Sequence, residues 1–191
     1  MAEVPCLPVV PWNFQSLFYV NAMVNYFDFF GIAPAPRIDQ AELKRKFYAN
    51  SRTFHPDFHT LADAASQEEA LEKSTLNNQA YKTLMNPDQR LKHLLDINGV
   101  LGAEGTNQVP QDFLMEIMEV NEALMELEFD DDPAVKTKVN ALIDQLENDL
   151  EQEVEGLVNH YDQATVSPEE LSRLKDYYLK KRYLLRLRGK I

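Results

Sequence analysis

The stretch of sequence that decides the fold is Phe54-His55-Pro56-Asp57-Phe58, which follows one amphipathic segment and precedes two others. Pro56 has no backbone N–H and disfavours helical geometry at the residue before it, so a helix must end near His55. We therefore expect His55 and Asp57 to be displayed on a loop between helices. Such a loop indicates a docking tip for another protein.

The segment before this loop predicts a helix from Asp39 to Phe54. Asp39 is the N-cap candidate and Glu42, three residues later, completes a capping box. At about 100° per residue, the apolar side chains fall on one stripe and a basic face lies opposite. A run of charge is usually a solvated surface, but this face has no acidic residue between its first and last cation, which favours a binding face. Its members are Lys44, Arg45, Lys46 and Arg52.

Two further helices are predicted after the loop and a short one before the basic helix. Ser66 and Glu69 form a capping box that opens the first, which ends near Met85. Asn86-Pro87 then caps and begins the second, and Gly99 offers its C-terminal stop. The short helix spans Asn25 to Phe30.

Residues 25–98 resemble the J domain of the DnaJ-type co-chaperones. The opening Tyr26-Phe27 and Phe29-Phe30-Gly31-Ile32 match its first helix, and His55-Pro56-Asp57 matches its signature. Within that class, the resemblance is to the HscB family of iron–sulfur cluster assembly, on residues 54–58 and on Asn77-Asn78-Gln79-Ala80-Tyr81-Lys82-Thr83-Leu84. Asn50 departs from the pattern, which expects an apolar residue there.

This resemblance implies a chaperone partner. A DnaK-type ATPase of the HscA kind would contact the tip and the basic face of the preceding helix. The residues implied are His55, Pro56, Asp57, Lys44, Arg45, Lys46 and Arg52.

The composition agrees with a helical, partner-binding protein. The chain has 191 residues, 45% of them hydrophobic and only six glycines, and shows helical rather than alternating periodicity. A single cysteine, Cys6, cannot form an internal disulfide, so a reducing, cytoplasmic location is expected. The four histidines have no companions at metal-ligand spacing, so neither a metal nor another cofactor is expected. One of them, His93, is expected at the surface or edge of a helix.

Residues 1–24 are predicted to be an apolar extension outside the J domain. They are punctuated by proline, and no Lys or Arg occurs before Arg37, so they lack the basic region of a signal peptide. No uncharged apolar segment of the chain reaches the roughly 18 residues that span a membrane, and no membrane partner is expected.

The net charge of −12 is unevenly distributed. Residues 101–166 hold 17 acidic residues against two lysines, an excess of 17 − 2 = 15 negative charges, whereas residues 173–190 hold eight basic residues and one acid. Nucleic-acid binding needs a dominant positive field and is disfavoured. The basic C-terminal segment is instead expected to pair with the acidic helices beside it.

The C-terminal half predicts an antiparallel three-helix bundle. Residues 99–110 are rich in Gly, Asn and Thr and form a linker, and residues 111–191 form the bundle. Its helices are expected at about Gln111–Glu128, at about Ala134–Tyr161, and from the capping box Ser167-Pro168-Glu169-Glu170 onwards. The fold class is therefore all-α, a J domain joined to this bundle.

The first bundle helix carries more apolar surface than one core face needs. Besides its core stripe, Leu114, Met118 and Met125 form a second stripe about 120° away. This stripe could pack on the third helix or on the J domain. Alternatively, methionines mixed with acidic residues suit an adaptable, exposed partner site.

Asp112-Phe113-Leu114-Met115-Glu116-Ile117-Met118-Glu119 resembles the client-binding helix of the HscB family. The resemblance implies contact with an iron–sulfur cluster scaffold protein of the IscU kind. Its apolar contacts would be Leu114, Met115 and Met118, and its acidic rim Glu119, Glu122 and Glu126. An aromatic residue of the last helix, Tyr177 or Tyr178, would complete the surface.

These features support one main hypothesis, a co-chaperone that binds the scaffold and delivers it to the HscA-like chaperone while stimulating its ATPase. A general J-domain co-chaperone for other unfolded clients is the alternative, and weak self-association stays open. An enzyme is disfavoured, because the chain has no Gly-rich phosphate loop, nucleophile elbow or metal-ligand cluster.

Overall fold

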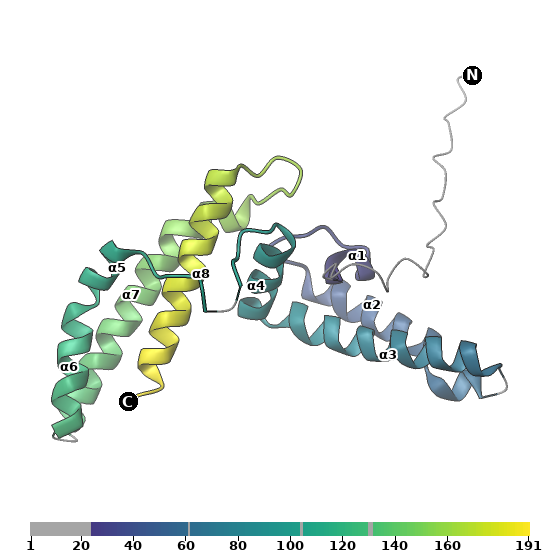
Figure 1. Ribbon diagram of the computed structural model, residues 1–191, viewed down its shortest axis with the longest axis horizontal. Helices are drawn as coiled ribbons and strands as arrows, with labels where there is room; N and C mark the ends of the chain where they lie inside the picture. The colour runs from purple at the N-terminus through teal and green to yellow at the C-terminus, as the bar shows by residue number, and fades with distance from the viewer. Residues whose placement is uncertain (1–23, 61, 104, 130–131) are drawn as a thin grey trace.

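The structure, a computed structural model, describes residues 24–60, 62–103, 105–129 and 132–191. Throughout these ranges the regular elements are helices, and no strand occurs. Figure 1 shows two lobes along the longest axis, with α1–α4 in one and α5–α8 in the other. The predicted all-α class, a J-like helical hairpin joined to a bundle, is confirmed. The predicted extension, residues 1–24, lies outside the described residues except for Val24.

The first lobe is built on an antiparallel hairpin of α2 and α3, with a 3-10 turn, η2, at its tip (Figure 1). The elements are α1 (Tyr26–Phe30), α2 (Gln40–Thr53), η2 (Pro56–His59), α3 (Ala64–Met85) and α4 (Pro87–Ile97). The side chains of Asn25, Asp39 and Asn86 accept hydrogen bonds from the first backbone N–H groups of α1, α2 and α4. Each boundary is therefore set by a local cap, as the sequence predicts for α2 and α4.

The start of α3 differs from the prediction. The helix begins at Ala64, and Asp63 rather than Ser66 is its N-cap, because the Asp63 carboxylate accepts a hydrogen bond of 2.9 Å from the Ser66 N–H. The backbone and side chain of Ser66 together lower the pKa of Asp63. A charged carboxylate also suits the positive end of the helix dipole, so Asp63 displaces the predicted serine cap.

The second lobe is an antiparallel bundle. Its elements are α5 (Gln111–Glu116), α6 (Met118–Phe129), α7 (Pro133–Asn159) and α8 (Pro168–Arg188). The predicted capping box of α8 is confirmed: Ser167 N–H donates to Glu170 at 2.8 Å, and Glu170 N–H donates to the Ser167 hydroxyl at 3.2 Å. The largest fully buried side chains of its core are Phe113, Ile117, Val120, Val139, Ile143 and Leu184.

The first bundle helix is interrupted, where the sequence predicts one helix from Gln111 to Glu128. Ile117 has φ −89° and ψ 7°, outside the helical range, and separates α5 from α6. Ile117 is β-branched and fully buried, so its core packing competes with ideal helical geometry at a residue of modest helix propensity. Its N–H still bonds to Phe113 at 3.1 Å, which keeps the two pieces nearly continuous.

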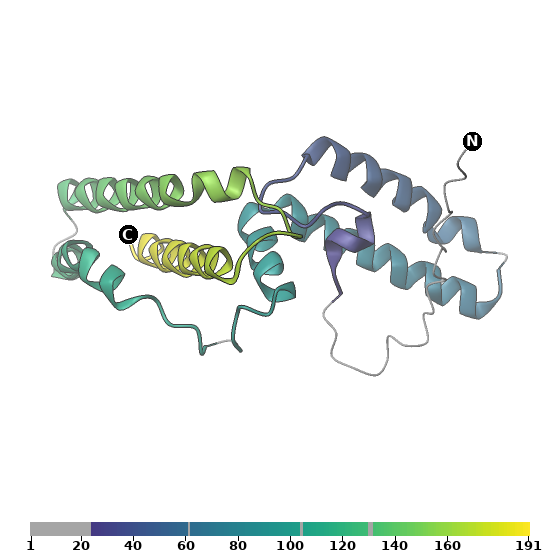
Figure 2. The ribbon, with the colours of Figure 1, turned by 90° about the horizontal axis from the view of Figure 1, so that it is seen from above.

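The two lobes are joined by packing between α4 and α8. Leu91 and Leu95 of α4 form one buried cluster with three side chains of α8, Leu174, Tyr178 and Leu179. Figure 2 shows α4 lying between the bundle and the rest of the first lobe. Because this cluster is apolar and buried, it holds the lobes in one relative orientation.

Two polar contacts flank this cluster. Arg37 donates a hydrogen bond of 2.6 Å to the Asn159 side chain at the end of α7. Asn98, just after α4, exchanges side-chain hydrogen bonds of 2.8 and 3.3 Å with Gln163 in the α7–α8 loop. Both connect segments far apart in the sequence, so they reinforce the interface that the apolar cluster forms.

The basic C-terminal helix pairs with the acidic helix beside it, as the charge distribution predicts. Arg188 of α8 donates to Asp144 at 2.6 Å and to Glu147 at 2.9 Å, both on α7. These contacts, led by the hydrogen bond to Asp144, raise the pKa of Arg188. The pairing compensates part of the excess negative charge of α7.

His93 corrects a second expectation. The sequence places it on the surface or edge of a helix, but its side chain is buried, and its ring stacks on Tyr26 with centroids 4.3 Å apart. Its Nε2 accepts a hydrogen bond of 3.0 Å from the Tyr26 N–H, one of the first N–H groups of α1. The prediction was wrong because α1 covers this face of α4, a contact that the local sequence does not encode.

His93 should make stability depend on pH. Burial lowers its pKa below the ordinary 6.5; nearby Asp96 opposes this shift and Lys92 adds to it. Below about pH 6.5 the unfolded chain binds a proton that the folded chain resists, so the free energy of unfolding falls as pH falls. In urea titrations between pH 7.5 and 5, His93→Gln should lose this part of the pH dependence. An unchanged slope in the variant would show that His93 titrates alike in both states.

Candidate functional site

The tripeptide His55-Pro56-Asp57 forms an exposed turn at the end of the α2–α3 hairpin farthest from the bundle (Figure 1). His55 is the N-cap of η2, and its Nδ1 accepts a hydrogen bond of 3.2 Å from the Asp57 N–H. Pro56 occupies the first turn, where its missing N–H costs nothing. The turn is therefore organised by the three residues themselves.

The Asp57 carboxylate projects into solvent. Its side chain is 84% exposed, and its nearest ionisable neighbour is the His55 ring at 3.7 Å. Phe58, the next residue, is 75% exposed, and its ring meets His55 edge-on with centroids 5.9 Å apart. A carboxylate and an apolar ring held out together can contact another protein without any rearrangement of the core.

The basic face of α2 is only partly as predicted. Lys44, Arg45 and Arg52 are exposed, and within the described residues no ion pair or hydrogen bond engages their side chains. Lys46 differs: it is half-buried, donates to the Gly31 carbonyl at 2.6 Å and pairs with Glu42 at 3.2 Å. Lys46 thus fastens α1 to α2, and the other three cations form the available face.

The second candidate surface lies on α5 and α6, in the other lobe. The second stripe of the sequence is exposed rather than packed on α8 or on the first lobe. Met115 is 69% exposed, Met118 58% and Met125 61%, with Leu114 at 41%. These four account for nearly half of the exposed large apolar side chains in the described chain. An apolar patch of this kind marks a partner site.

The acidic residues of this surface are solvent-exposed. Glu119 pairs with Lys138 of α7 at 3.2 Å, with both side chains about 60% exposed. Glu122 and Glu126 are exposed and have no partner among the described residues. An exposed ion pair contributes at most about 1 kcal/mol, so Glu119 can exchange Lys138 for a partner's cation.

The two tyrosines predicted for this surface lie elsewhere. Tyr178 is buried in the cluster between α4 and α8, and its hydroxyl accepts a hydrogen bond of 3.3 Å from Arg182. Tyr177 faces the cleft between the lobes, where Lys181 bonds to its hydroxyl at 3.5 Å. Both positions are used by the interface between lobes, so neither supplies the aromatic residue beside α5.

Tyr183 is the aromatic residue of α8 that lies beside α5. Its half-buried ring meets Phe113 edge-on, with centroids 6.5 Å apart. The sequence does contain a signal for this position. Tyr183 precedes Leu187, a core residue of the same helix, by four residues, so the two side chains share one face of α8. Tyr183 therefore lies next to the exposed surface of α5 and α6. We call the following candidate set the client surface: Leu114, Met115, Met118, Met125, Glu119, Glu122, Glu126 and, at its border, Tyr183.

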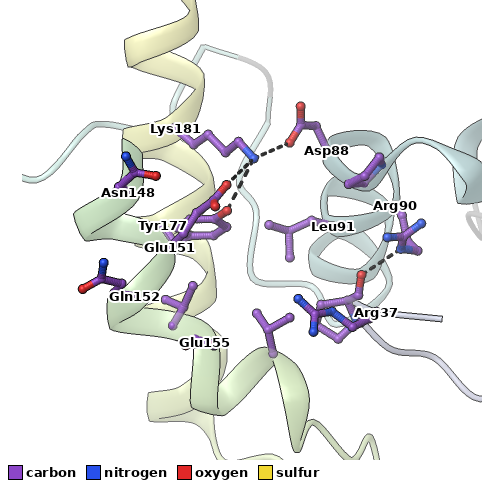
Figure 3. A pocket seen from close by; sticks show the side chains of 14 residues that line it. Arg37, Asp88, Arg90, Leu91, Asn148, Glu151, Gln152, Glu155, Tyr177 and Lys181 are labelled. Atoms are coloured by element: carbon purple, nitrogen blue, oxygen red, sulfur yellow. Dashed lines mark hydrogen bonds and ion pairs between the residues drawn. The ribbon is translucent and has the colours of Figure 1, made fainter. Parts of the chain in front are cut away.

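The cleft between the lobes, about 420 Å³, is lined by α4, α7 and α8. Figure 3 shows Lys181 pointing toward Asp88 of α4 and Glu151 of α7, at 3.2 and 3.5 Å. Burial opposes the charge of Lys181, but Tyr177 and Asp88 outweigh it and raise the pKa of the lysine. Lys181 thus links three helices and stays charged at neutral pH.

No group of three or more potential metal ligands occurs in the part of the chain that the structure describes. Within the same residues, no helix has both the length and the apolar character needed to cross a membrane. Cys6 lies outside them. The expectation of no metal and no cofactor stays a prediction.

Comparison with known proteins agrees with both lobes. Residues 109–191 match the family model of the HSCB C-terminal oligomerisation domain. A co-chaperone protein HscB homolog of Shewanella halifaxensis is 35% identical over 111 residues, 58% of this chain and 64% of that protein. The human iron-sulfur cluster co-chaperone protein HscB is 33% identical over 135 residues, 68% of this chain and 57% of that protein.

The crystal structure of human co-chaperone protein HscB superposes with a TM-score of 0.68 at 26% identity, covering 90% of this chain and 82% of that one. The chain is therefore similar to HscB proteins in the sequence of its C-terminal lobe and in its overall fold. Chaperone HscB from Vibrio cholerae, at 24% identity and a TM-score of 0.62, covers 87% of this chain and 94% of that one and shares the fold.

The sequence matches span less than two thirds of the length of these HscB relatives. These relatives are co-chaperones by name. The described chain carries both the exposed tip and the exposed surface of α5 and α6.

The packing between the lobes should carry much of the stability. Leu95 is fully buried in the cluster between α4 and α8, so Leu95→Ala should cost about 2–5 kcal/mol of unfolding free energy. Leu71→Ala, at a side chain 58% exposed, is the matched control and should change it by less than about 0.5 kcal/mol. Urea titration measures both. Equal, small losses would show that the lobes do not depend on this cluster.

Proposed function

We propose that this chain is a co-chaperone of iron–sulfur cluster assembly. It binds a cluster scaffold protein of the IscU kind through its client surface and delivers it to a DnaK-type chaperone of the HscA kind. Through its tip it stimulates the ATPase of that chaperone. Similarity to HscB proteins supports the process, since the human relative is named an iron-sulfur cluster co-chaperone.

The observation that carries this proposal is the placement of two exposed surfaces at opposite ends of one chain. Asp57 is exposed on η2, at the tip of the α2–α3 hairpin, and Met115 and Met118 are exposed on α5 and α6. Figure 1 shows this hairpin tip and α5–α6 at opposite ends of the molecule. The packing of α4 on α8 connects the lobes between them. Two partners can therefore bind at the same time without competing for the same residues.

At the tip, the Asp57 carboxylate and the cations of α2 would stabilise one state of the chaperone. A ligand shifts a conformational equilibrium only through different contacts with its two states. Asp57 and the unpaired Lys44, Arg45 and Arg52 provide charges of both signs for such contacts. The chain itself performs no covalent chemistry, and we place it in the cytoplasm on the evidence of its single cysteine.

At the client surface, methionines can adapt to a folded partner. Their side chains are unbranched and polarisable, so Met115 and Met118 can repack against the scaffold. Leu114 supplies a stiffer contact at the edge, and Tyr183 of α8 an aromatic one. The exposed glutamates Glu119, Glu122 and Glu126 would then pair with cations of the scaffold.

The tip is tested by Asp57→Asn in a steady-state ATPase assay of an HscA-type chaperone. The variant should return the rate to that of the chaperone alone, because the amide removes the charge at an 84% exposed position. Its affinity for the scaffold should be unchanged. Asp149→Asn, an exposed substitution on α7, is the matched control and should stimulate like wild type. Full stimulation by Asp57→Asn would refute the role of the tip.

The client surface is tested by truncating Leu114, Met115 and Met118 together to alanine. Because the three side chains are 41–69% exposed, the free energy of unfolding should change little, while the scaffold affinity should fall by about a hundredfold. A double control, Leu71→Ala with Leu185→Ala, removes exposed apolar surface elsewhere and should bind normally. Calorimetric titration and thermal unfolding give both quantities.

The opposite pattern would contradict this assignment. If the triple variant unfolds at a much lower temperature and binds the scaffold normally per folded molecule, the stripe serves the bundle core. If the wild-type chain captures diverse unfolded proteins and no scaffold, it is a general J-domain co-chaperone. ATP hydrolysis by the purified chain alone would contradict the proposal that it is not an enzyme.

A further inference from the structure

The two flanks of α6 face different neighbours. At about 100° per residue, the buried side chains of α6 define one direction, with Glu119, Glu122 and Glu126 on one side of it and Met118 and Met125 on the other. Glu119 pairs with Lys138, so the acidic flank lies toward α7. Met125 lines a cleft of about 310 Å³ with Lys190, so the methionine flank lies toward the end of α8.

The α8 edge beside the methionine flank is basic. Lys180 Nζ lies 5.3 Å from the centre of the Phe113 ring, over α5. The Arg186 guanidinium lies 5.4 Å from the ring of Tyr183, which itself contacts Phe113. Lys190 follows one turn later and is exposed. These three cations therefore border the apolar part of the client surface.

None of these cations has an acidic partner in the described chain, whereas two other cations of α8 do. Lys181 pairs with Asp88 and Glu151, and Arg188 pairs with Asp144 and Glu147. Lys180 and Arg186 contact only aromatic rings, an interaction worth about 0.5–1 kcal/mol at exposed sites. The chain has a net charge of −12, so acidic partners are abundant, yet these three cations of α8 pair with none of those described. Internal ion pairs therefore do not explain why the three cations are there.

We propose that Lys180, Arg186 and Lys190 form a basic rim of the client surface, opposite its acidic rim, and that they bind carboxylates of the cluster scaffold. The proposal rests on the proposed function and deepens it. The surface then has three parallel zones: glutamates toward α7, methionines in the middle and cations on α8. A scaffold must present acidic side chains to α8 and basic ones to α6, with an apolar strip between.

This arrangement fixes the direction in which the scaffold binds. Opposite charges at the edges of an apolar contact accelerate association and exclude the reversed orientation, because like charges would then face each other. A surface with acidic residues alone would accept any basic partner in several orientations. The basic rim therefore selects a partner that presents acidic and basic side chains at fixed positions on one face. An unfolded segment does not hold its charges in a fixed arrangement.

The test is charge reversal in the full chain, with a purified IscU-type scaffold as the probe in calorimetric titrations. Lys180→Glu/Arg186→Glu should weaken the affinity by about tenfold or more at low ionic strength. The loss should shrink as salt screens it. Lys175→Glu makes the same charge change as Arg186→Glu alone, but it lies about three turns from Arg186 along α8 and about 140° around the helix from Lys180; it should bind like wild type. Arg186→Glu alone, at an exposed side chain, should lose part of the affinity without lowering the unfolding temperature.

The outcomes separate the rim from the proposed function. If both charge-reversed variants bind the scaffold like wild type while the Leu114/Met115/Met118 variant does not, the basic rim is refuted and the client surface stands. If Lys175→Glu weakens binding equally, a general charge effect replaces the rim. If wild type does not bind the scaffold at all, the proposed function and the rim both fail.

Discussion

The buried contact between α4 and α8 is the constraint on which the rest of the structure depends. Leu91 and Leu95 enter a cluster with Leu174, Tyr178 and Leu179, and Lys181 bonds across its edge to Asp88. Without this contact the chain would be a J-like hairpin and a helical bundle on a short linker. With it, the exposed tip and the client surface keep one separation and orientation, so an adaptor can present one partner to the other.

The same contact explains which residues are free to bind partners. Tyr177, Tyr178 and Lys181 are used between the lobes, which leaves Tyr183 and the unpaired cations of α8 for the client surface. Likewise, Lys46 is used to hold α1, which leaves three exposed cations of α2, Lys44, Arg45 and Arg52, for the proposed chaperone contact. On one helix, residues of the same type therefore have different roles. Those covered by a neighbouring element hold the fold together, and those left exposed can contact a partner.

Local features were predictable from the sequence, and contacts between distant segments were not. Asp39, Asn86 and Ser167 are caps because a short polar side chain bonds to the next backbone N–H groups, a rule that needs only neighbours in sequence. Helical periodicity placed Leu114, Met118 and Met125 on a second stripe, but it left open whether that stripe is packed or exposed. His93 was misplaced because its partner, Tyr26, is 67 residues away, and Tyr177 and Tyr178 because α4 covers that part of α8.

The central claim is that both surfaces must act on one chain, and a mixing experiment tests it most directly. Asp57→Asn keeps only the client surface, and the Leu114/Met115/Met118 alanine variant keeps only the tip. The scaffold-dependent stimulation of an HscA-type ATPase is measured with wild type and with an equimolar mixture of the two variants. The account predicts strong stimulation by wild type and none by the mixture; stimulation by the mixture equal to wild type would contradict it.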